Sequence, residues 1–300
     1  MIYTVTFNPA IDYTVKLSAL IPGGLNRNLA EDYLFGGKGI NVSGVLKNLG
    51  VDSVALGFVA GFTGEGLEKG LQDQGIATRF IRVAQGMTRI NVKVKAREET
   101  EINGIGPVIT PEDMQALYTI LDTLLPGDIL VLSGSIPSCL PDNTYETILA
   151  RLEGQQILTV VDATKDLLVN VLKYHPFLIK PNNHELGEIF GEVPVTDAQI
   201  IACARKLQEM GGRNILVSLA GDGALLLDEA GNHHRIGCPK GQLVNSVGAG
   251  DSMVAGFLAG YLQTGDYNYA LKLGTAAGSA TAFSIGLGEK KLIDELMKQL

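Results

Sequence analysis

The hydrophobic positions of this chain follow two alternating periods. Short apolar runs are each followed by a segment in which apolar residues recur at three- and four-residue spacing, which is typical of a buried strand leading into a helix. The predicted strands cover 2–7, 54–59, 80–83, 129–133, 158–162, 177–180 and 214–218, with a hairpin at 223–228 and 233–236. The predicted helices cover 66–74, 112–124, 143–152, 197–210, 251–262 and 269–283, and one more runs from Gly39 to Gly50. This order predicts an α/β fold in which helices cover both faces of a mostly parallel sheet.

Two polar segments do not fit inside such a sheet. Residues 11–35 alternate loosely and contain turn residues, and residues 88–102 alternate strictly, which predicts a half-exposed antiparallel strand. Lys93 and Lys95 are expected to be solvated lysines of that strand. We expect segments 11–35 and 88–104 to form a small β-sheet that projects as a lid over a site at the strand ends. Because no linker or repeat interrupts the pattern, residues 1–300 are predicted to be one domain with this lid.

Composition and charge limit the possible functions. The net charge is −8 and no run of five like charges occurs, so a nucleic-acid-binding face is not expected. The three widely spaced cysteines indicate neither a metal site nor a disulfide framework, which favours a reducing compartment. No stretch of about 18 apolar residues and no basic leader is evident. The expectation is a cytoplasmic protein that does not cross a membrane.

The glycine loop at 245–252, Asn-Ser-Val-Gly-Ala-Gly-Asp-Ser, is the strongest chemical signal. Gly248, Ala249 and Gly250 can turn their amides outward at a helix start, which makes a site for an anion. Asp251 follows in the first helical turn, where the helix dipole alone would also favour a carboxylate. A carboxylate beside such amides is what phosphoryl transfer to an alcohol requires, since it can accept the hydroxyl proton.

A second glycine loop, Gly-Gly-Lys-Gly-Ile-Asn at 36–41, also opens a helix. Its spacing matches neither the P-loop nor the dinucleotide-binding motif. Its glycines allow a ligand close to the backbone, Lys38 adds a positive charge and Asn41 offers an amide. The alternative is a simple turn with a solvated lysine.

Two further features have open interpretations. Asn182 and Glu185 stand three residues apart at a helix start, where they would suit Mg²⁺ held through waters or, equally, a capping box without metal. The glycine cluster at 218–224 is by itself compatible with an ordinary hairpin turn.

Together these motifs resemble the ribokinase-like, PfkB-type carbohydrate kinases. The resemblance covers the whole chain in the family's order, from Asn-Pro-Ala-Ile-Asp at 8–12 through both glycine loops, and implies a three-layer α/β/α fold with a β lid. It implies ATP and Mg²⁺ as cofactors, a small sugar phosphate as the other partner, and pairing of lids in a homodimer. The segment 161–166 departs from the family pattern after its strand, which affects fine specificity and leaves the reaction class unchanged.

The resemblance also implies roles for individual residues. Asp251 would be the base, and Gly248, Ala249 and Gly250 would form the anion hole. The substrate site would comprise Asp12, Arg27, Gly37, Lys38, Asn41, Arg89 and Ser133, with Arg27, Lys38 and Arg89 around the substrate phosphate. The nucleotide site would comprise Lys180, Ser218, Gly221, Gly223, Ala277 and Ser279. Asn182 and Glu185 would organise Mg²⁺.

Within this family, Lys38 between the glycines resembles the branch that acts on ketohexose phosphates. The segment 88–93 and Asn26-Arg27 are most similar to members that convert fructose 1-phosphate to fructose 1,6-bisphosphate. Kinases of tagatose 6-phosphate or fructose 6-phosphate are the alternatives among enzymes. A sugar-phosphate sensor without catalysis is an alternative of another class, which Asp251 disfavours because a sensor needs no base.

Overall fold

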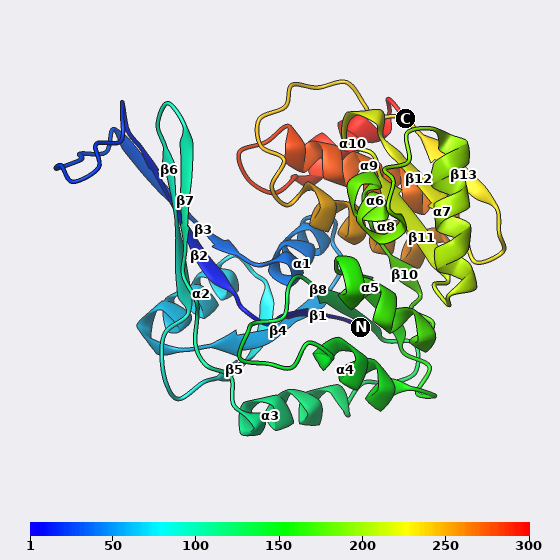
Figure 1. Ribbon diagram of the computed structural model, residues 1–300, viewed down its shortest axis with the longest axis horizontal. Helices are drawn as coiled ribbons and strands as arrows, with labels where there is room; N and C mark the ends of the chain where they lie inside the picture. The colour runs from blue at the N-terminus through cyan, green and yellow to red at the C-terminus, as the bar shows by residue number, and fades with distance from the viewer.

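A nine-stranded sheet forms the centre of the protein, in a computed structural model that describes all 300 residues (Figure 1). The strand order is β13-β12-β11-β10-β9-β8-β1-β4-β5. The strands from β11 to β5 are parallel to their neighbours, whereas β12 and β13 are antiparallel at one edge. The strands are β1 Ile2–Thr6, β4 Ser53–Val59, β5 Ala77–Arg82, β8 Ile129–Ser133, β9 Leu158–Asp162, β10 Leu178–Ile179, β11 Asn214–Ser218, β12 Ala224–Leu227 and β13 His233–Ile236.

Helices cover both faces of this sheet, as the sequence predicted. The helices are α1 Lys38–Asn48, α2 Gly61–Asp73, α3 Pro111–Leu121, α4 Thr144–Leu152, α5 Lys165–Val171, α6 Asn183–Phe190, α7 Asp197–Glu209, α8 Ala249–Thr264, α9 Tyr267–Ala282 and α10 Lys290–Met297. One core cluster joins the sheet to α3, α4 and α7, and the other joins it to α1, α8 and α9. In β8 the side chains alternate between them, with Leu130 and Leu132 in the first cluster and Ile129 and Val131 in the second. Both faces of the strand are therefore buried, which explains its unbroken apolar sequence.

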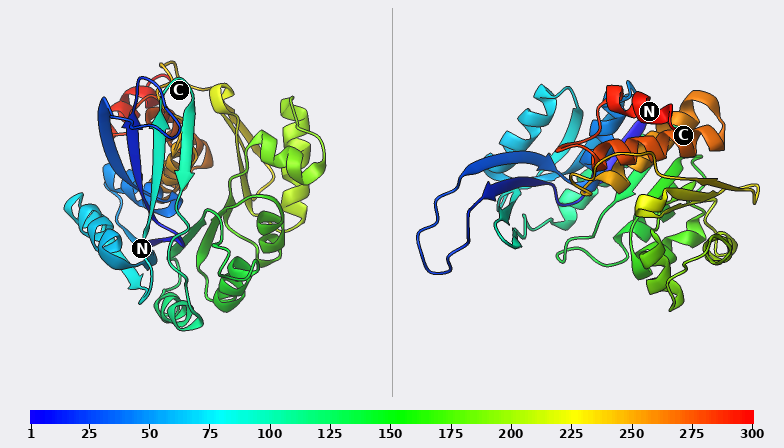
Figure 2. Two further views of the ribbon diagram at one scale, coloured as in Figure 1. Left: turned by 60° about the vertical axis from the view of Figure 1, so that its left-hand side comes forward. Right: turned by 90° about the horizontal axis from the view of Figure 1, so that it is seen from above.

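The predicted small sheet is present and has four strands in the order β3-β2-β6-β7. Its strands are β2 Ala10–Lys16, β3 Ala30–Gly36, β6 Arg89–Lys95 and β7 Glu99–Asn103. The strand expected over 88–102 is a hairpin, because residues 96–98 turn between β6 and β7, and β6 pairs in parallel with β2. Figure 2 shows this sheet projecting from the main body, with the 17–29 loop at its far end.

Three helices were not predicted by periodicity. Helices α5, α6 and α10 have seven or eight residues each, so each provides only two turns of apolar spacing. No helix of the protein has the length and apolar character needed to cross a membrane.

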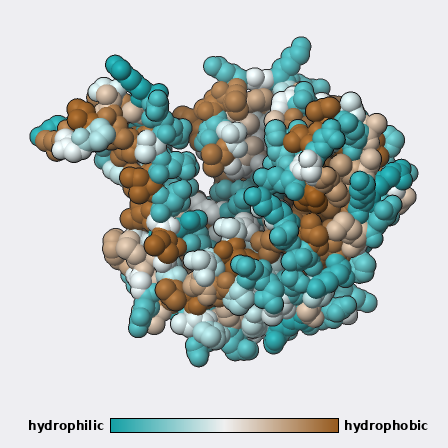
Figure 3. Space-filling model, in the orientation of Figure 1, coloured by the Kyte–Doolittle hydropathy of each residue, from teal (hydrophilic) through white to brown (hydrophobic).

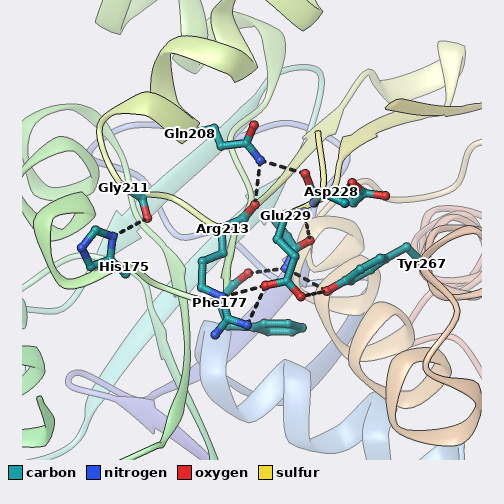
Figure 4. A network of polar contacts seen from close by, with 10 residues as sticks. His175, Phe177, Gln208, Gly211, Arg213, Asp228, Glu229 and Tyr267 are labelled. Atoms are coloured by element: carbon teal, nitrogen blue, oxygen red, sulfur yellow. Dashed lines mark hydrogen bonds and ion pairs between the residues drawn. The ribbon is translucent and has the colours of Figure 1, made fainter. Parts of the chain in front are cut away.

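A network of polar contacts lies at the amino ends of the parallel strands β10 and β11, at the end of the sheet opposite their carboxyl ends (Figure 4). The fully buried Asn214 donates its amide to the Phe177 carbonyl oxygen at 2.8 Å and accepts from the Glu229 backbone N–H at 3.0 Å. The Glu229 carboxylate accepts from Arg213 at 2.6 and 2.9 Å and from the Tyr267 hydroxyl at 2.6 Å. Asn214 thus links β11 to the segments that precede β10 and follow β12.

Replacing Asn214 with alanine is expected to lower the free energy of unfolding by about 2 kcal/mol, because the buried Phe177 carbonyl oxygen and the Glu229 N–H lose their hydrogen bonds to the Asn214 side chain. Urea unfolding measures this change. Lys290→Ala is the matched control, since its ion pair with Asp294 is exposed and contributes less than about 0.5 kcal/mol. Equal stability of the two variants would contradict the role assigned to Asn214.

Candidate active site

Asp251 lies in the first turn of α8, where the glycine loop meets the helix. Gly248 is the N-cap with φ of 81°, a backbone conformation that L side chains rarely adopt. The Ala249 N–H donates to the Ser246 carbonyl oxygen at 3.2 Å, whereas the N–H groups of Gly250 and Asp251 donate to no backbone acceptor. Free amides at a helix N-terminus bind anions. The two free N–H groups are therefore suited to bind an anion beside the Asp251 carboxylate, and we refer to them as the anion site.

The Asp251 carboxylate is buried, with 5% of the residue exposed. Asn41, from α1, donates its side-chain amide to Asp251 Oδ2 at 2.8 Å and so fixes the orientation of the carboxylate. Burial, followed by the negative charge of Asp162, raises the pKa of Asp251 to about 7, against the lowering effects of Asn41, Lys38 and Lys180. A carboxylate with this pKa is suited to accept a proton near neutral pH.

Two lysines share the buried carboxylate of Asp162, at the end of β9. Lys38 Nζ lies 3.1 Å from one oxygen of Asp162 and Lys180 Nζ lies 3.3 Å from the other. Burial alone would raise the pKa of Asp162, but Lys180 and Lys38 hold it below its ordinary value. Lys180 also lies beside the anion site, since a Cβ placed at Gly250 would be 3.1 Å from its Nζ. The cluster therefore brings two cations close to the free amides at the start of α8.

Asp162 is a site residue that the sequence analysis missed. Its segment was noted only as a departure from the family pattern, although its position at the carboxyl end of a buried strand was a usable signal. The structure also places Lys38 differently from the expectation. Its ammonium pairs with Asp162, near Asp251 and Glu185, whose charges raise the pKa of Lys38 against the opposing effect of burial.

The small sheet contributes a polar face to the site. On β2 and β6 the register pairs Ala10 with Arg89 and Asp12 with Asn91, so these side chains lie on one side, which we call the inner face. Asn91 donates its amide to Asp12 Oδ1 at 2.8 Å, and Arg89 Nε donates to the Asn8 carbonyl oxygen at 3.1 Å. Asp12 is therefore held with its second oxygen free, beside a guanidinium.

Arg27 does not lie on the inner face with Asp12 and Arg89. It lies exposed in the loop between β2 and β3, at the far end of the small sheet.

Ser133 ends β8 beside the site, and its buried hydroxyl has no hydrogen-bond partner. The following glycine, Gly134, lies close to Lys38, since a Cβ there would be 3.8 Å from Lys38 Cδ.

A cavity of about 480 Å³ opens between the inner face and α1. It is lined by Asp12, Gly36 and Lys93 from the small sheet and by Asn41 from α1. Figure 3 shows the surface hollowed between the small sheet and the main body. Asn41 both lines the cavity and donates a hydrogen bond to Asp251. A molecule held by Asp12 in the cavity can therefore extend toward the Asp251 carboxylate.

The residues expected at the nucleotide do not all lie together, since Lys180 belongs to the charged cluster beside Gly250 and the others lie on β11, the turn that follows it and α9. Ser218 ends β11 and bridges to Asn182, while Gly221 and Gly223 lie in the turn between β11 and β12. Ser279, in α9, has its hydroxyl 3.5 Å from Cys238 Sγ. The expectation for Ala277 requires a correction. Its side chain is fully buried and packs against α8, where a Cβ at Gly256 would be 2.8 Å from the Ala277 Cβ, so it does not face the cleft.

Asn182 and Glu185 form the capping box that was the alternative to a metal site. Glu185 Oε2 accepts from the Asn182 backbone N–H at 2.8 Å, and Asn182 Oδ1 accepts from the Glu185 backbone N–H at 2.8 Å. Glu185 Oε1 takes no hydrogen bond within the protein and lies near enough to Lys38 to raise its pKa. No group of three or more metal-ligating side chains occurs, so an ion here would rest on few protein oxygens and on waters.

Comparisons with known proteins agree with this geometry. The chain matches the family model described as pfkB family carbohydrate kinase over residues 5–293. A 1-phosphofructokinase of Bacillus subtilis is 47% identical over 300 residues, which cover 100% of this chain and 98% of that protein. A D-tagatose-1-phosphate kinase of Bacillus licheniformis is 38% identical over 301 residues and covers 100% of this chain and 98% of that protein. Phosphofructokinase-2 from Escherichia coli, solved in complex with fructose-6-phosphate, has a TM-score of 0.91 and 26% identity and covers 99% of this chain and 98% of that chain.

Proposed function

The chain belongs to the pfkB family of carbohydrate kinases, and we propose that it transfers the γ-phosphoryl group of ATP to the C6 hydroxyl of fructose 1-phosphate, giving fructose 1,6-bisphosphate. The observation that carries the reaction type is Asp251, a buried carboxylate with pKa raised to about 7 beside free amides of a helix N-terminus. The full-length identity of 47% to a 1-phosphofructokinase supports the substrate.

In this proposal Asp251 accepts the proton of the attacking hydroxyl as the new P–O bond forms. Asn41 orients the carboxylate, because its amide hydrogen bond leaves Asp251 Oδ1 for the substrate. The free amides of Gly250 and Asp251 stabilise the charge on the transferred group, and Lys180 adds a cation next to them. Lys38, held by its ion pair with Asp162, adds a second positive charge near Asp251 and favours the ionised form of that carboxylate.

The acceptor is held from the small sheet. The free oxygen of Asp12 is available for sugar hydroxyls, and Arg89 keeps two terminal nitrogens for a bidentate phosphate contact. Gly37, with φ of 136°, lets the backbone approach the sugar, and the unpaired Ser133 hydroxyl supplies a further donor. Closure of the small sheet as a lid would exclude water, which otherwise competes as acceptor.

ATP would bind near Ser218 at the end of β11, the turn that holds Gly221 and Gly223, and Ser279 of α9. Mg²⁺, when bound, neutralises charge on the phosphates of ATP. The residues present fit a site of this kind, since Glu185 keeps one carboxylate oxygen outside the capping box for a water ligand of the ion and Asn182 lies beside it.

We further propose a homodimer paired through the small sheet. Exposed apolar side chains gather on this sheet and its loop, among them Ile21, Leu25, Leu29, Tyr33 and Ile102. A patch of this kind marks a protein contact. We place the protein in the cytoplasm, because its three cysteines are free thiols.

The test is an assay of ADP release with Mg-ATP against fructose 1-phosphate, D-tagatose 1-phosphate, tagatose 6-phosphate, fructose 6-phosphate and free fructose. We expect the highest kcat/KM with fructose 1-phosphate. Highest activity with fructose 6-phosphate or tagatose 6-phosphate would overturn the substrate and move the attacking hydroxyl to C1. Absence of turnover with every acceptor, together with binding of sugar phosphate, would favour the sensor.

A second substrate is favoured by one observation, the similarity to a D-tagatose-1-phosphate kinase. Fructose and tagatose differ only in the configuration at C4, so both 1-phosphates would present the same C6 hydroxyl to Asp251. Comparing kcat/KM for the two epimers therefore tests recognition at C4 alone.

A further inference from the structure

Lys93 occupies the inner face of the small sheet, near Asp12. The pairing of β6 with β7 places Glu101 directly opposite Lys93, yet the lysine makes no ion pair with that carboxylate. Its ammonium turns toward the base of the sheet instead, where Nζ lies 4.0 Å from Asp12 Oδ2. Only 17% of its side chain is exposed, so it differs from the solvated lysine that the sequence pattern indicated.

The ammonium of Lys93 has donors to spare. A separation of 4.0 Å is too long for a hydrogen bond, and no protein atom accepts a hydrogen bond from the Lys93 ammonium. The side chain lines the cavity together with Asp12 and Asn41. An ammonium with three free donors at the wall of a substrate cavity is suited to an anionic oxygen of the ligand.

The other cations expected at the substrate phosphate are placed elsewhere in this chain. Lys38 is paired with Asp162 beside the transfer site, and Arg27 is exposed in the distal loop. Of the three cations expected at the substrate phosphate, only Arg89 is left. A phosphate group carries about −1.5 to −2 charges at neutral pH, so a single guanidinium does not neutralise it.

We propose that Lys93 binds the non-reacting phosphate of the acceptor together with Arg89 and thereby selects phosphorylated over free ketohexoses. This inference rests on the proposed function. Residues 89 and 93 lie on the same face of β6 and are separated by about 13 Å along the strand, a span that an arginine and a lysine can bridge by leaning toward each other. Asp12 lies between them on the neighbouring strand, where it meets the sugar hydroxyls while its charge holds Lys93 in the cavity.

The test compares Lys93→Met with Lys16→Met, its matched control, in steady-state assays. Lys16 is an exposed lysine at the end of the neighbouring strand and does not line the cavity. We expect Lys93→Met to raise KM for fructose 1-phosphate about 10- to 100-fold, the range for loss of a charge-assisted contact, with KM for ATP unchanged. Lys16→Met is expected to stay within about two-fold of the wild type, because Lys93 is still present. Lys93→Arg is expected to recover most of the loss, because it retains a cation at position 93.

The ratio of kcat/KM for fructose 1-phosphate to that for free fructose identifies the contact. A fall in this ratio in Lys93→Met supports a contact with the phosphate. An equal loss with both acceptors would mean that Lys93 only orients Asp12 and would overturn the proposal, as would an unchanged KM for fructose 1-phosphate. A wild-type enzyme that does not prefer fructose 1-phosphate would instead refute the proposed function, so the two failures are distinguishable.

Discussion

Replacing Asp251 with asparagine is expected to lower kcat about 10²- to 10⁴-fold while the dissociation constants of sugar phosphate and ATP stay near their wild-type values. The amide has the shape of the carboxylate and can still accept the hydrogen bond from Asn41 through its oxygen. It cannot accept the proton of the attacking hydroxyl. Single-turnover rates, with binding measured by isothermal titration, separate the chemical step from binding.

The pH dependence of the wild-type enzyme provides a second measure of the same role. Because the pKa of Asp251 is about 7 and the base must be ionised, kcat/KM is expected to fall about ten-fold per pH unit below pH 7 and to level off above it. The residual activity of Asp251→Asn should lack this acid limb. An acid limb retained in the variant would assign the titration to another group and contradict Asp251 as the base.

Stability supplies the control for this variant. The folded pKa of about 7 exceeds the ordinary value of 3.8, so the folded state holds a proton that the unfolded state has released between these two pH values. The wild-type free energy of unfolding therefore decreases as pH rises from about 4 to 7. The asparagine of Asp251→Asn does not ionise, so the free energy of unfolding of this variant does not decrease in this way. The variant should therefore be more stable than the wild type at pH 8, by at most about 4 kcal/mol. Its inactivity would then not result from unfolding.

The parts of this fold that follow from local sequence were predictable. The alternation of strand and helix periods predicted a sheet covered by helices on both faces, and the glycines before Asp251 predicted where α8 begins. Both features depend on residues that are adjacent in the chain. The capping box of Asn182 and Glu185 is local in the same sense, and its spacing already allowed it as one of two interpretations.

Contacts between distant segments were not predictable in this way. Lys38 and Asp162 are 124 residues apart, so no pattern around either residue indicates their ion pair. The parallel pairing of β6 with β2 decides that Lys93 faces Asp12, and a strand's own alternation does not specify which face meets the cavity. Ala277 was misplaced because α9 is apolar on most of its surface, so its sequence does not indicate which side packs against α8.

Replacing Asp162 with asparagine is expected to reduce stability and to move the acid limb of the pH profile toward lower pH. The buried Lys180, with 7% of its side chain exposed, would lose its only carboxylate partner, which costs about 3–5 kcal/mol. At the same time, the negative charge of Asp162 that raises the pKa of Asp251 would be gone, while Lys38 and Lys180 would still favour the ionised form of Asp251. The pKa of Asp251 should therefore fall toward its ordinary value.

The opposite change provides the comparison for Asp162→Asn. Lys180→Met removes a cation that lowers the pKa of Asp251, so its acid limb should move toward higher pH. Urea unfolding checks the stability change, with Arg151→Ala as an exposed ion-pair control expected to lose less than about 1 kcal/mol. Acid limbs of kcat/KM that move in the same direction in both variants would show that the cluster does not set the pKa of Asp251. Opposite movements would establish that Lys180 and Asp162 together hold the base near neutrality, which is the condition for its proton transfer at physiological pH.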